Sequence, residues 1–427
     1  MTLDRRTFLR RTAWGAAGLG VAAVAVAGGA EGNAPLPAYD DRSPEPFWRA
    51  VRGRYPLSPR LTYFNTGGLG PAAQTVLDRA AAVTRELQEK SEHGHALHEG
   101  ARATLARFLG ADADEIAFVR NATEGNSIIA AGLSLRSGDE VVFETHAHPG
   151  GSFPWANQEK LRGVGLKLFE PDPTDAAGNL ARIMALLTPR TRVLQVSHVT
   201  APTGIVMPVD ALARLCRERG IWFHVDGAQS AGMFPFSLHT IGCDSFATSG
   251  HKWLGGPLET GVLYVRRDRV DEVAPTLVGS YSGELDFLPG ELRLARTAIR
   301  FEYGTRSAAA ILGLAEAVAF QESIGRERIA ARGRWLAARV RAGLEKLPDV
   351  EILTPAKPGL SAAMTTFRSP RLAFDRLFER LFKDHAIRCR PVSEQRLNAV
   401  RVSTHLFNSP EECDALVARV GEILRRA

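Results

Sequence analysis

The sequence predicts an α/β protein with a large domain built on a central sheet and a smaller α+β domain at the C-terminus. Strand and helix patterns alternate along most of the chain, which is typical of helices packed on both faces of a mainly parallel sheet. The 427 residues exceed the size at which a single core stops growing, so two domains are expected. Helical patterns over residues 308–323 and 326–347 lead into the smaller domain.

Seven short apolar segments have the composition of buried strands, and we expect them to form one mainly parallel sheet. Their ranges are 115–119, 139–144, 166–169, 192–197, 221–226, 244–248 and 261–265. We expect a Pro-rich leading segment over residues 31–60, a large domain over 61–307 and a small domain over 308–427.

Residues 1–30 have the pattern of an export signal. Arg5 and Arg6 precede an uncharged stretch of Ala, Gly and Val over residues 12–30, which is typical of a twin-arginine signal. The stretch is long enough to span a bilayer, but its Gly and Ala content makes it too weakly apolar for a stable membrane anchor. We therefore expect cleavage after Ala27 or Ala30 and a periplasmic or otherwise extracytoplasmic protein, exported folded by the twin-arginine machinery.

Composition gives no case for nucleic acid or a metal as ligand. The formal net charge is +6, of which one acidic and four basic residues between positions 4 and 11 supply +3. The remainder is too small for an electrostatic argument for nucleic acid. Among the four cysteines, Cys216 and Cys413 fall in helical patterns, where a lone thiol is usually a small buried hydrophobe, and no metal-ligand spacing occurs. The spacing leaves open whether a disulfide forms.

One lysine and one aspartate are the most informative pair in the chain. Lys252 lies in a Gly-containing run over 248–256, and Asp226 stands at the end of the predicted strand 221–226. Their spacing of 26 positions allows a connection and one further strand, so both side chains are expected at the carboxyl edge of the sheet, where α/β folds bind ligands. Taken alone, Lys252 has the alternative of a solvated loop residue, and Asp226 that of a helix N-cap.

The pair meets the needs of pyridoxal phosphate (PLP). A lysine amine holds this cofactor as a Schiff base, and it is nucleophilic only when burial or cationic neighbours lower its pKa. The cofactor stabilises a substrate carbanion only while its ring nitrogen stays protonated, which a fixed aspartate secures. The sequence therefore predicts PLP as the cofactor, Lys252 as its anchor and as a general base, and Asp226 as the partner of the ring nitrogen.

Four motifs, in this order along the chain, resemble the class V aminotransferase family of fold-type I PLP enzymes, and the resemblance covers residues 61–427. The similar runs are Asn-Ala-Thr-Glu-Gly over 121–125, Val-Asp-Gly-Ala-Gln over 225–229, Ser-Gly-His-Lys over 249–252 and Phe-Glu-Tyr-Gly-Thr over 301–305. The resemblance implies the fold of that family, with a large PLP-binding domain and a smaller C-terminal domain.

The resemblance also implies a role for each matching residue. Ala122 and Thr123, at a helix N-terminus, would bind the cofactor phosphate together with Ser249 and His251. Gln229 would lie near the cofactor's phenolic oxygen. Thr305 would reach the phosphate of the other subunit's cofactor, which implies a homodimer with shared active sites.

Three further positions follow from the same resemblance. The run Thr-His-Ala-His over 145–148 resembles the site of an aromatic ring stacked on the cofactor; His146 is preferred and His148 is the alternative. Arg401, in the run 399–403, resembles the arginine that binds the substrate α-carboxylate through two parallel hydrogen bonds. Asn65, in the Gly-rich segment 61–70, is expected to contact the substrate. An ordinary core or surface histidine and an exposed strand arginine are the plain alternatives.

The resembled family includes cysteine desulfurases, epimerases and lyases, and one departure separates these activities. A desulfurase needs a nucleophilic cysteine on a mobile loop, whereas the run 387–393 offers only Cys389, which we interpret as a structural thiol near a strand end. Desulfuration is therefore disfavoured. We expect a PLP-dependent enzyme that acts on the amino group or α-carbon of an amino acid or amino-acid-containing metabolite, by transamination, epimerisation or elimination. Alternatives are tailoring of a siderophore-type peptide side chain in the periplasm and a non-catalytic, ligand-binding member of the fold.

Overall fold

The structure is a computed structural model that describes residues 35–286 and 290–427. Leu36–Ala427 forms one compact unit. The predicted export signal, with its arginine pair and both cleavage positions, lies outside the described residues. The domain boundaries expected within the unit stay a prediction.

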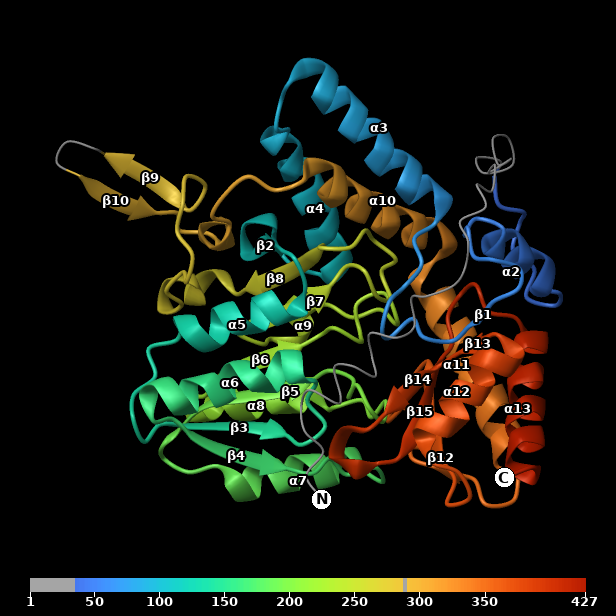
Figure 1. The fold of residues 1–427 in the computed structure, drawn as a ribbon. Coiled ribbons are helices and arrows are strands. Elements are labelled where there is room, and N and C mark those ends of the chain that lie inside the picture. The colour runs from blue at the N-terminus through green and yellow to red at the C-terminus, as the bar shows by residue number, and fades with distance from the viewer. Residues whose placement is uncertain (1–34, 287–289) are drawn as a thin grey trace. The chain divides into compact units, whose positions relative to one another are not determined.

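A seven-stranded, mainly parallel sheet forms the centre of the unit, as predicted (Figure 1). Each strand begins and ends within one residue of its predicted range. The strand at 261–265 runs antiparallel to both of its neighbours, because its connection from the preceding strand contains no helix and is too short for a parallel crossover. In spatial order the strands are β2 (Ile116–Val119), β8 (Gly261–Val265), β7 (Ser245–Ser249), β6 (Trp222–Asp226), β5 (Thr191–Ser197), β3 (Glu140–Glu144) and β4 (Gly165–Phe169).

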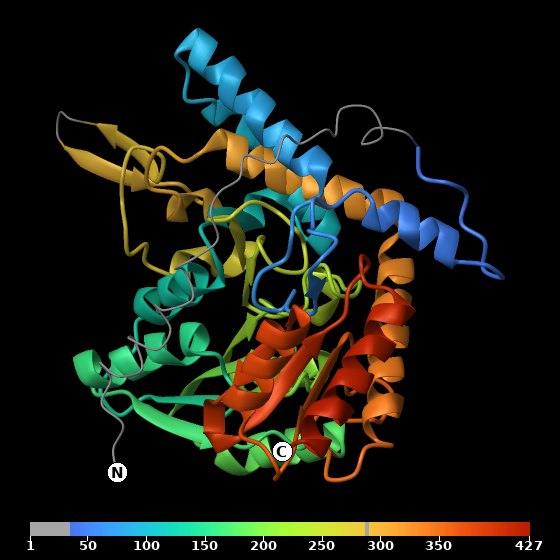
Figure 2. The ribbon, with the colours of Figure 1, turned by 45° about the vertical axis from the view of Figure 1, so that its right-hand side comes forward.

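Helices cover both faces of this sheet (Figures 1 and 2). One hydrophobic core joins the sheet to α5 (Ala122–Gly132) and α6 (Pro149–Arg162). A second core joins the other face to α4 (His98–Leu109), α8 (Val209–Arg219) and α10 (Ala308–Ile324).

The alternation of side chains along β6 decides which residues meet which helices. Successive residues of a strand point to opposite faces, and Phe223 and Val225 belong to the core with α8. Trp222 belongs to the core with α5 and α6. His224 and Asp226, two and four residues further on, therefore point toward α5 and α6 as well.

The C-terminal part is an antiparallel sheet packed against three helices. Its helix α11 (Arg326–Leu344), with α10, corresponds to the two helices predicted from the sequence. Phe64 packs in this C-terminal core although it lies near the start of the chain, and β1 (Thr62–Tyr63) pairs with β13 (Ile387–Arg388). The remaining elements here are β11 (Glu351–Ile352), β12 (Met364–Arg368), α12 (Phe374–His385), β14 (Arg390–Val392), η5 (Glu394–Arg396), β15 (Ala399–Ser403) and α13 (Pro410–Arg425).

A hairpin of two strands, β9 (Gly283–Asp286) and β10 (Glu291–Leu294), extends away from the central sheet in both ribbon views (Figures 1 and 2). The other elements surround the layers already described. They are α2 (Glu45–Arg52), α3 (Gln74–Lys90), η1 (His95–Leu97), η2 (Ala113–Glu115), α7 (Ala176–Leu186), α9 (Leu238–Ile241), η3 (Arg267–Glu272) and η4 (Ala298–Phe301).

All four cysteines are buried free thiols. Cys389 lies between β13 and β14, where burial raises the pKa of its thiol to about 12. Such a thiol stays protonated at neutral pH and is a poor nucleophile. Its position agrees with the structural role expected from the sequence.

Within residues 35–286 and 290–427, no single helix has both the length and the apolar composition of a membrane span. Only α10 and α11 taken together reach that composition, and the two helices meet at an angle of 80°.

A buried ion pair fixes the segment that follows η4. The guanidinium of Arg102 donates to the carboxylate of Glu302 over 2.7 and 3.2 Å and to the carbonyl of Ile116 over 2.7 Å. Glu302 also accepts from the backbone N–H of Phe118 over 2.7 Å. Arg102 thereby ties α4 and β2 to the segment that carries Thr305.

We expect Arg102→Met to lower the free energy of unfolding by about 3–5 kcal/mol, because it leaves the Glu302 carboxylate buried without its cation. Chemical denaturation followed by circular dichroism measures the change. The matched control is Arg107→Met on the same helix, since the Arg107–Glu322 pair is solvent-exposed and should change stability by less than about 1 kcal/mol. Equal effects of the two substitutions would contradict the expectation.

Candidate active site

The carboxyl ends of β6 and β7 open into a cavity of about 270 Å³. The residues that line it come from several separate segments of the chain. They are Gly67, Gly68, Asn121, Ala122, Thr123, Asn126, His148, Gly150, Ala201, Asp226, Ala228, Gln229, Ser249, His251, Lys252, Arg390 and Arg401. The structure thus brings together most of the site residues predicted from the sequence.

Lys252 follows β7 and lies half-buried in the cavity wall. Burial lowers the pKa of its amine to about 8, against the opposing charge of Asp226, and the guanidinium groups of Arg401 and Arg390 lower it further. A substantial fraction of the amine is therefore neutral near pH 8. Gly70 packs so closely on the backbone of Lys252 that a Cβ at this position would collide with the lysine carbonyl.

Asp226 presents its carboxylate at the end of β6 and is only 5% exposed. Its Oδ1 accepts from the backbone N–H of Ala228 over 3.0 Å, and its Oδ2 accepts from the side chain of Asn126 over 2.9 Å. These bonds compensate for lost hydration and fix the direction of the carboxylate. The N-cap alternative does not apply, because the next helix, α9, begins only at Leu238.

Behind Asp226, four side chains form one buried chain of hydrogen bonds. Trp222 Nε1 donates to Ser245 Oγ over 2.9 Å, and Ser245 lies 2.8 Å from His224 Nδ1. His224 Nε2 lies 2.8 Å from Asn126 Oδ1, and Asn126 donates in turn to Asp226. Because burial lowers the pKa of His224 to about 4, its ring is neutral and carries one proton. Asn126 Oδ1 can only accept, so the single proton of His224 lies on Nε2 and Nδ1 accepts from Ser245. All the bonds therefore point the same way and end on the aspartate.

The N-terminus of α5 lies beside this pair and offers donors to an anion. Asn121 caps the helix by accepting from the N–H of Glu124 over 3.0 Å, and Ser249 Oγ accepts from the N–H of Ala122 over 3.0 Å. Thr123 lines the same cavity, and the buried Nδ1 of His251 has no hydrogen-bond partner. Helix N-terminus, hydroxyls and an unpartnered imidazole nitrogen together fit a phosphate group.

The preference for His146 over His148 is not supported by the arrangement. His146 is not among the residues that line the cavity, and its Nδ1 lies 2.9 Å from the hydroxyl of Thr203. His148 caps α6 by accepting from the N–H of Gly150 over 3.0 Å, and this cap position directs its ring into the cavity. Burial and the nearby charge of Lys252 lower the pKa of His148 to about 4, so the ring is neutral.

Arg401 projects from β15 into the cavity and is 1% exposed. It donates to the carbonyl of Ala201 over 2.6 Å and lies 3.5 Å from Oδ1 of Asn65. Among the described residues it has no carboxylate partner, and burial, with the charge of Arg390, lowers its pKa to about 9. Asn65 therefore lies next to the Arg401 side chain and does not line the cavity.

Gln229 and the Gly-rich turn close the cavity on the same side. The amide of Gln229 donates to the carbonyl of Gly67 over 2.9 Å and accepts from Trp253 over 2.8 Å. A Cβ on Gly67 would lie 2.6 Å from Arg401 Nη2 and 2.7 Å from Gln229 Oε1. Only glycine leaves room at this point of the wall.

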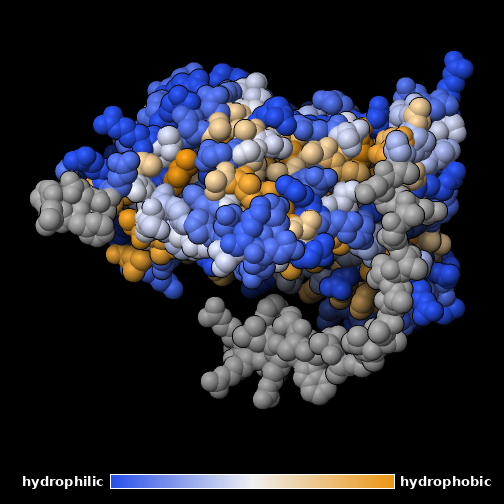
Figure 3. All heavy atoms as spheres, turned by 90° about the horizontal axis from the view of Figure 1, so that it is seen from above, coloured by the Kyte–Doolittle hydropathy of each residue, from blue (hydrophilic) through white to orange (hydrophobic). Residues whose placement is uncertain are grey.

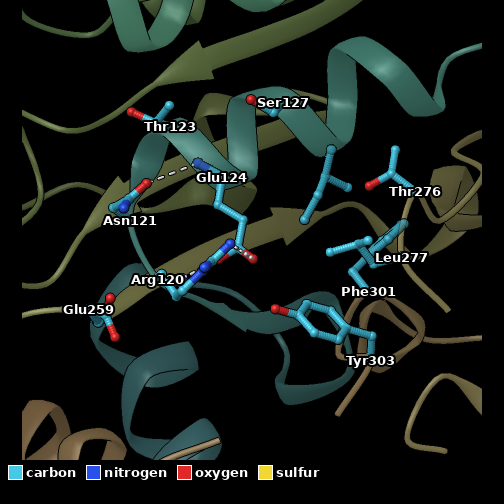
Figure 4. Close-up of a pocket in the computed structure, with 11 residues that line it drawn as sticks. Arg120, Asn121, Thr123, Glu124, Ser127, Glu259, Thr276, Leu277, Phe301 and Tyr303 are labelled. Atoms are coloured by element: carbon cyan, nitrogen blue, oxygen red, sulfur yellow. Dashed lines mark hydrogen bonds and ion pairs between the residues drawn. The ribbon is translucent and has the colours of Figure 1, made fainter. Parts of the chain in front are cut away.

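Thr305 does not line the cavity that holds Lys252. It lines a separate hollow of about 370 Å³ together with Tyr303 and Arg306. A neighbouring cavity of about 550 Å³ is lined by Tyr303 and by Asn121 and Thr123, which also line the Lys252 cavity (Figure 4). The hollow at Thr305 thus adjoins the cavity at Tyr303, which in turn adjoins the anion-binding end of the site at Asn121 and Thr123.

Sequence reasoning missed three residues of the site. His224 stands two residues before Asp226, and the period of a strand places both on one face, which is a signal available in the sequence. Asn126 stands one turn of helix after Thr123, which is a weaker signal. Arg390 faces Arg401 across two antiparallel strands, and this register could not be read from the sequence.

Comparison with known proteins places the chain in one protein family. The profile of the family described as Aminotransferase class-V matches residues 71–416. Isopenicillin N epimerase of Streptomyces clavuligerus is 30% identical over 88% of this chain and 99% of its own length. A probable cysteine desulfurase of Pyrococcus abyssi is 29% identical over 88% of this chain and 97% of its own length.

Solved structures agree in fold. The apo structure of the cysteine desulfurase from Thermococcus onnurineus NA1 has a TM-score of 0.81 and 27% identity, and it covers 91% of this chain and 100% of its own. The cystine C–S lyase C-DES, in complex with its product cysteine persulfide, has a TM-score of 0.79 and 28% identity, with 85% and 98% of the two chains covered. A C-DES variant with glycine linked covalently to its PLP cofactor matches equally well, with a TM-score of 0.79.

We expect Asn126→Leu to weaken PLP binding by roughly 10- to 100-fold, the worth of a hydrogen bond to a charged group. An analogue that lacks the ring nitrogen does not engage Asp226, so its affinity should change by less than about threefold. Equilibrium dialysis measures both affinities. His224→Gln, which keeps an N–H donor, should lose less than Asn126→Leu, and Ser127→Ala on α5 is the control. Equal losses for the two cofactors would show that Asn126 acts only on the fold.

Proposed function

The chain belongs to the class-V aminotransferase family, and from this premise we propose that it is a PLP-dependent enzyme acting on the amino group or α-carbon of an amino acid or amino-acid-containing metabolite. The single observation that carries the proposal is the meeting of Lys252 and Asp226 in one cavity with an anion site. PLP, when bound, supplies an electron sink for charge that develops at the substrate α-carbon.

The residues that would hold PLP are those at the two ends of the cavity. Ala122, Thr123 and Ser249 would bind the phosphate, and Asp226 would accept a hydrogen bond from the protonated ring nitrogen. His148 is placed to cover the ring. The unpartnered Nδ1 of His251 supports the fit, because a buried imidazole without a partner is costly unless a ligand satisfies it.

Lys252 and Arg401 would act on the substrate. Arg401 has no carboxylate partner in the described part of the chain, so its fork is available for the substrate α-carboxylate. That bond would hold the α-carbon near Lys252. Because the pKa of the Lys252 amine is lowered to about 8, the amine can accept the α-proton near neutral pH. It can then return this proton to the α-carbon or transfer it to another atom.

Three reaction types remain open to such a site. Isopenicillin N epimerase is an epimerase and C-DES is a cystine C–S lyase, and both are relatives over most of this chain. Cysteine desulfurases are relatives too, and they need a nucleophilic cysteine. The run 387–393 offers only Cys389, whose thiol is buried and has a raised pKa. Transamination, epimerisation or elimination therefore suits this chain better than desulfuration.

The working unit we propose is a homodimer with shared sites. Thr305 lies outside the cavity of its own subunit, beside the hollows that surround Thr123. Large apolar side chains are exposed there, with Leu258 64% and Leu277 49% accessible. Seen from above, the unit has apolar side chains scattered among hydrophilic ones (Figure 3). A second copy would cover this face and bring its own Thr305 to the phosphate.

We also propose that the enzyme is exported by the twin-arginine machinery and works outside the cytoplasm. The support is the sequence pattern of residues 1–30, with Arg5 and Arg6 before the uncharged stretch. Export of a folded protein would allow cofactor loading before transport.

Lys252→Ala should abolish turnover and the visible absorbance band of the bound cofactor while the protein stays folded, because it removes the amine that anchors PLP. Absorbance spectra of the purified variant and its circular dichroism check both statements. Lys346→Ala, at an exposed lysine, is the control. A Lys252→Ala protein with wild-type band and turnover would overturn the proposed function.

Subunit mixing tests the shared site. Thr305→Ala and Lys252→Ala should each be nearly inactive, the first through loss of a phosphate donor. In a heterodimer of the two, one site combines the intact lysine of one chain with the intact threonine of the other, so mixing under exchange conditions should restore activity. The restored activity should approach one quarter of the wild-type value for random exchange of equal amounts. No gain on mixing, or a fully active monomer in sedimentation experiments, would refute the shared site.

A further inference from the structure

Two arginines stand side by side in the cavity, and the mechanism uses only one of them. Arg390 in β14 is the register partner of Arg401 in β15, directly across the antiparallel pair. Directly opposed residues share a face with their Cβ atoms about 4.5–5.5 Å apart, and like charges in this position repel. Both guanidinium groups line the cavity with Lys252. Something must therefore compensate the second positive charge.

Glu394 compensates Arg390 and leaves Arg401 free. Its Oε1 forms an ion pair with Nη2 of Arg390. The two arginines and Glu394 thus carry one net positive charge, which matches one α-carboxylate. A substrate with a second carboxylate near Arg390 would bring a like charge beside Glu394.

The turn that carries Glu394 is held in a costly conformation. Gln395, Arg396 and Asn398 all have positive φ angles of 51°, 57° and 51°, a region that non-glycine residues seldom adopt. The amide of Gln395 donates to the carbonyl of Thr145 over 2.7 Å, which ties the turn to the segment that follows β3. Backbone strain of this kind persists where the surroundings hold a residue in one position, here Glu394 against Arg390.

The pair also leaves one donor and one acceptor unused. Nη1 of Arg390 and Oε2 of Glu394 are both buried and have no hydrogen-bond partner. A carboxylate satisfies only the donor, and an ammonium satisfies only the acceptor. A carboxamide or peptide amide has a carbonyl oxygen for Arg390 and an N–H for Glu394, and it adds no charge.

We propose that Arg390 and Glu394 form a side-chain subsite that selects an amino acid carrying an amide group and excludes the matching acid. This rests on the proposed function, because Arg401 must hold the α-carboxylate. Both arginines line one cavity from directly opposed positions, so an amino acid such as glutamine could present its α-carboxylate to Arg401 and its side-chain amide to Arg390. Arg390 and Glu394 are thus specificity-determining residues.

Glutamine and glutamate test this directly, since they have the same shape and differ in the charge of the side chain. Each is titrated into the PLP-loaded enzyme, as both stereoisomers, and binding is followed by the visible absorbance of the cofactor and by calorimetry. We expect glutamine to bind at least ~10-fold more tightly than glutamate. The reason is that repulsion between the glutamate side chain and Glu394, a few ångströms apart, lowers the affinity by about tenfold or more. L-Alanine, which has no side-chain polar group, reports on Arg401 alone.

Two substitutions then assign the effect. Glu394→Gln removes the opposing charge and should invert the preference, so that glutamate binds better than glutamine. Arg390→Gln removes the donor for the amide carbonyl and should weaken glutamine binding, while glutamate, which still faces the charge of Glu394, should stay the weaker ligand. Arg396→Gln, on the same turn but exposed, is the control and should keep the wild-type preference. Circular dichroism and cofactor content verify that each variant is folded and loaded.

The outcomes separate this inference from the proposed function. If wild type binds alanine but binds glutamine no better than glutamate, or if Glu394→Gln leaves the preference unchanged, the subsite is refuted and the proposed function stands. If no amino acid changes the absorbance of the loaded enzyme or releases heat, the proposed function fails and the subsite fails with it.

Discussion

The carboxylate of Asp226 is buried at the edge of a sheet, and the rest of the site is arranged around the demands of that charge. An ionised carboxylate loses its hydration on burial, at a cost that only hydrogen bonds and nearby positive charge offset. Asn126 and the N–H of Ala228 supply the bonds, and Lys252 supplies the charge. Asn126 is held in turn by His224, whose place on the strand is fixed by the same alternation that points Asp226 toward α5.

Close approach of backbone is the second constraint, and it follows from the first. The first turn of α6 lies beside the aspartate, where Asn126 also donates to the carbonyl of Gly150 over 3.1 Å, and a Cβ on Gly151 would lie 2.9 Å from Asp226 Oδ2. On the other side, a Cβ on Gly67 would collide with Arg401 and Gln229, and a Cβ on Gly70 would collide with the carbonyl of Lys252. A side chain at any of these three positions would displace the Asp226 carboxylate, the Arg401 and Gln229 side chains or the backbone of Lys252. The glycines are therefore part of the shape of the cavity.

The fold and the central pair could be predicted because both depend on local pattern. Strand ranges follow from runs of apolar residues, and the meeting of Asp226 with Lys252 follows from where the strands end. The choice between His146 and His148 depended on which residue caps α6, a matter of one residue that no periodicity resolves. The place of Arg390 depended on the register of β14 against β15, and the role proposed for Thr305 would depend on a second chain. Pairings between distant segments, which only the folded chain reveals, account for what the sequence did not show.

Charge is arranged as a gradient across the cavity, with Asp226 on one wall and two arginines on the other. Lys252 lies between them, so its ammonium is attracted by one wall and repelled by the other, while burial penalises the charged form throughout. The net effect is an amine that gives up its proton within the range of ordinary pH. Glu394 forms an ion pair with Arg390 and so opposes one of the two positive charges. The residue that we assign to substrate selection is thus also part of the charge balance of the cavity, and both roles depend on its pairing with Arg390.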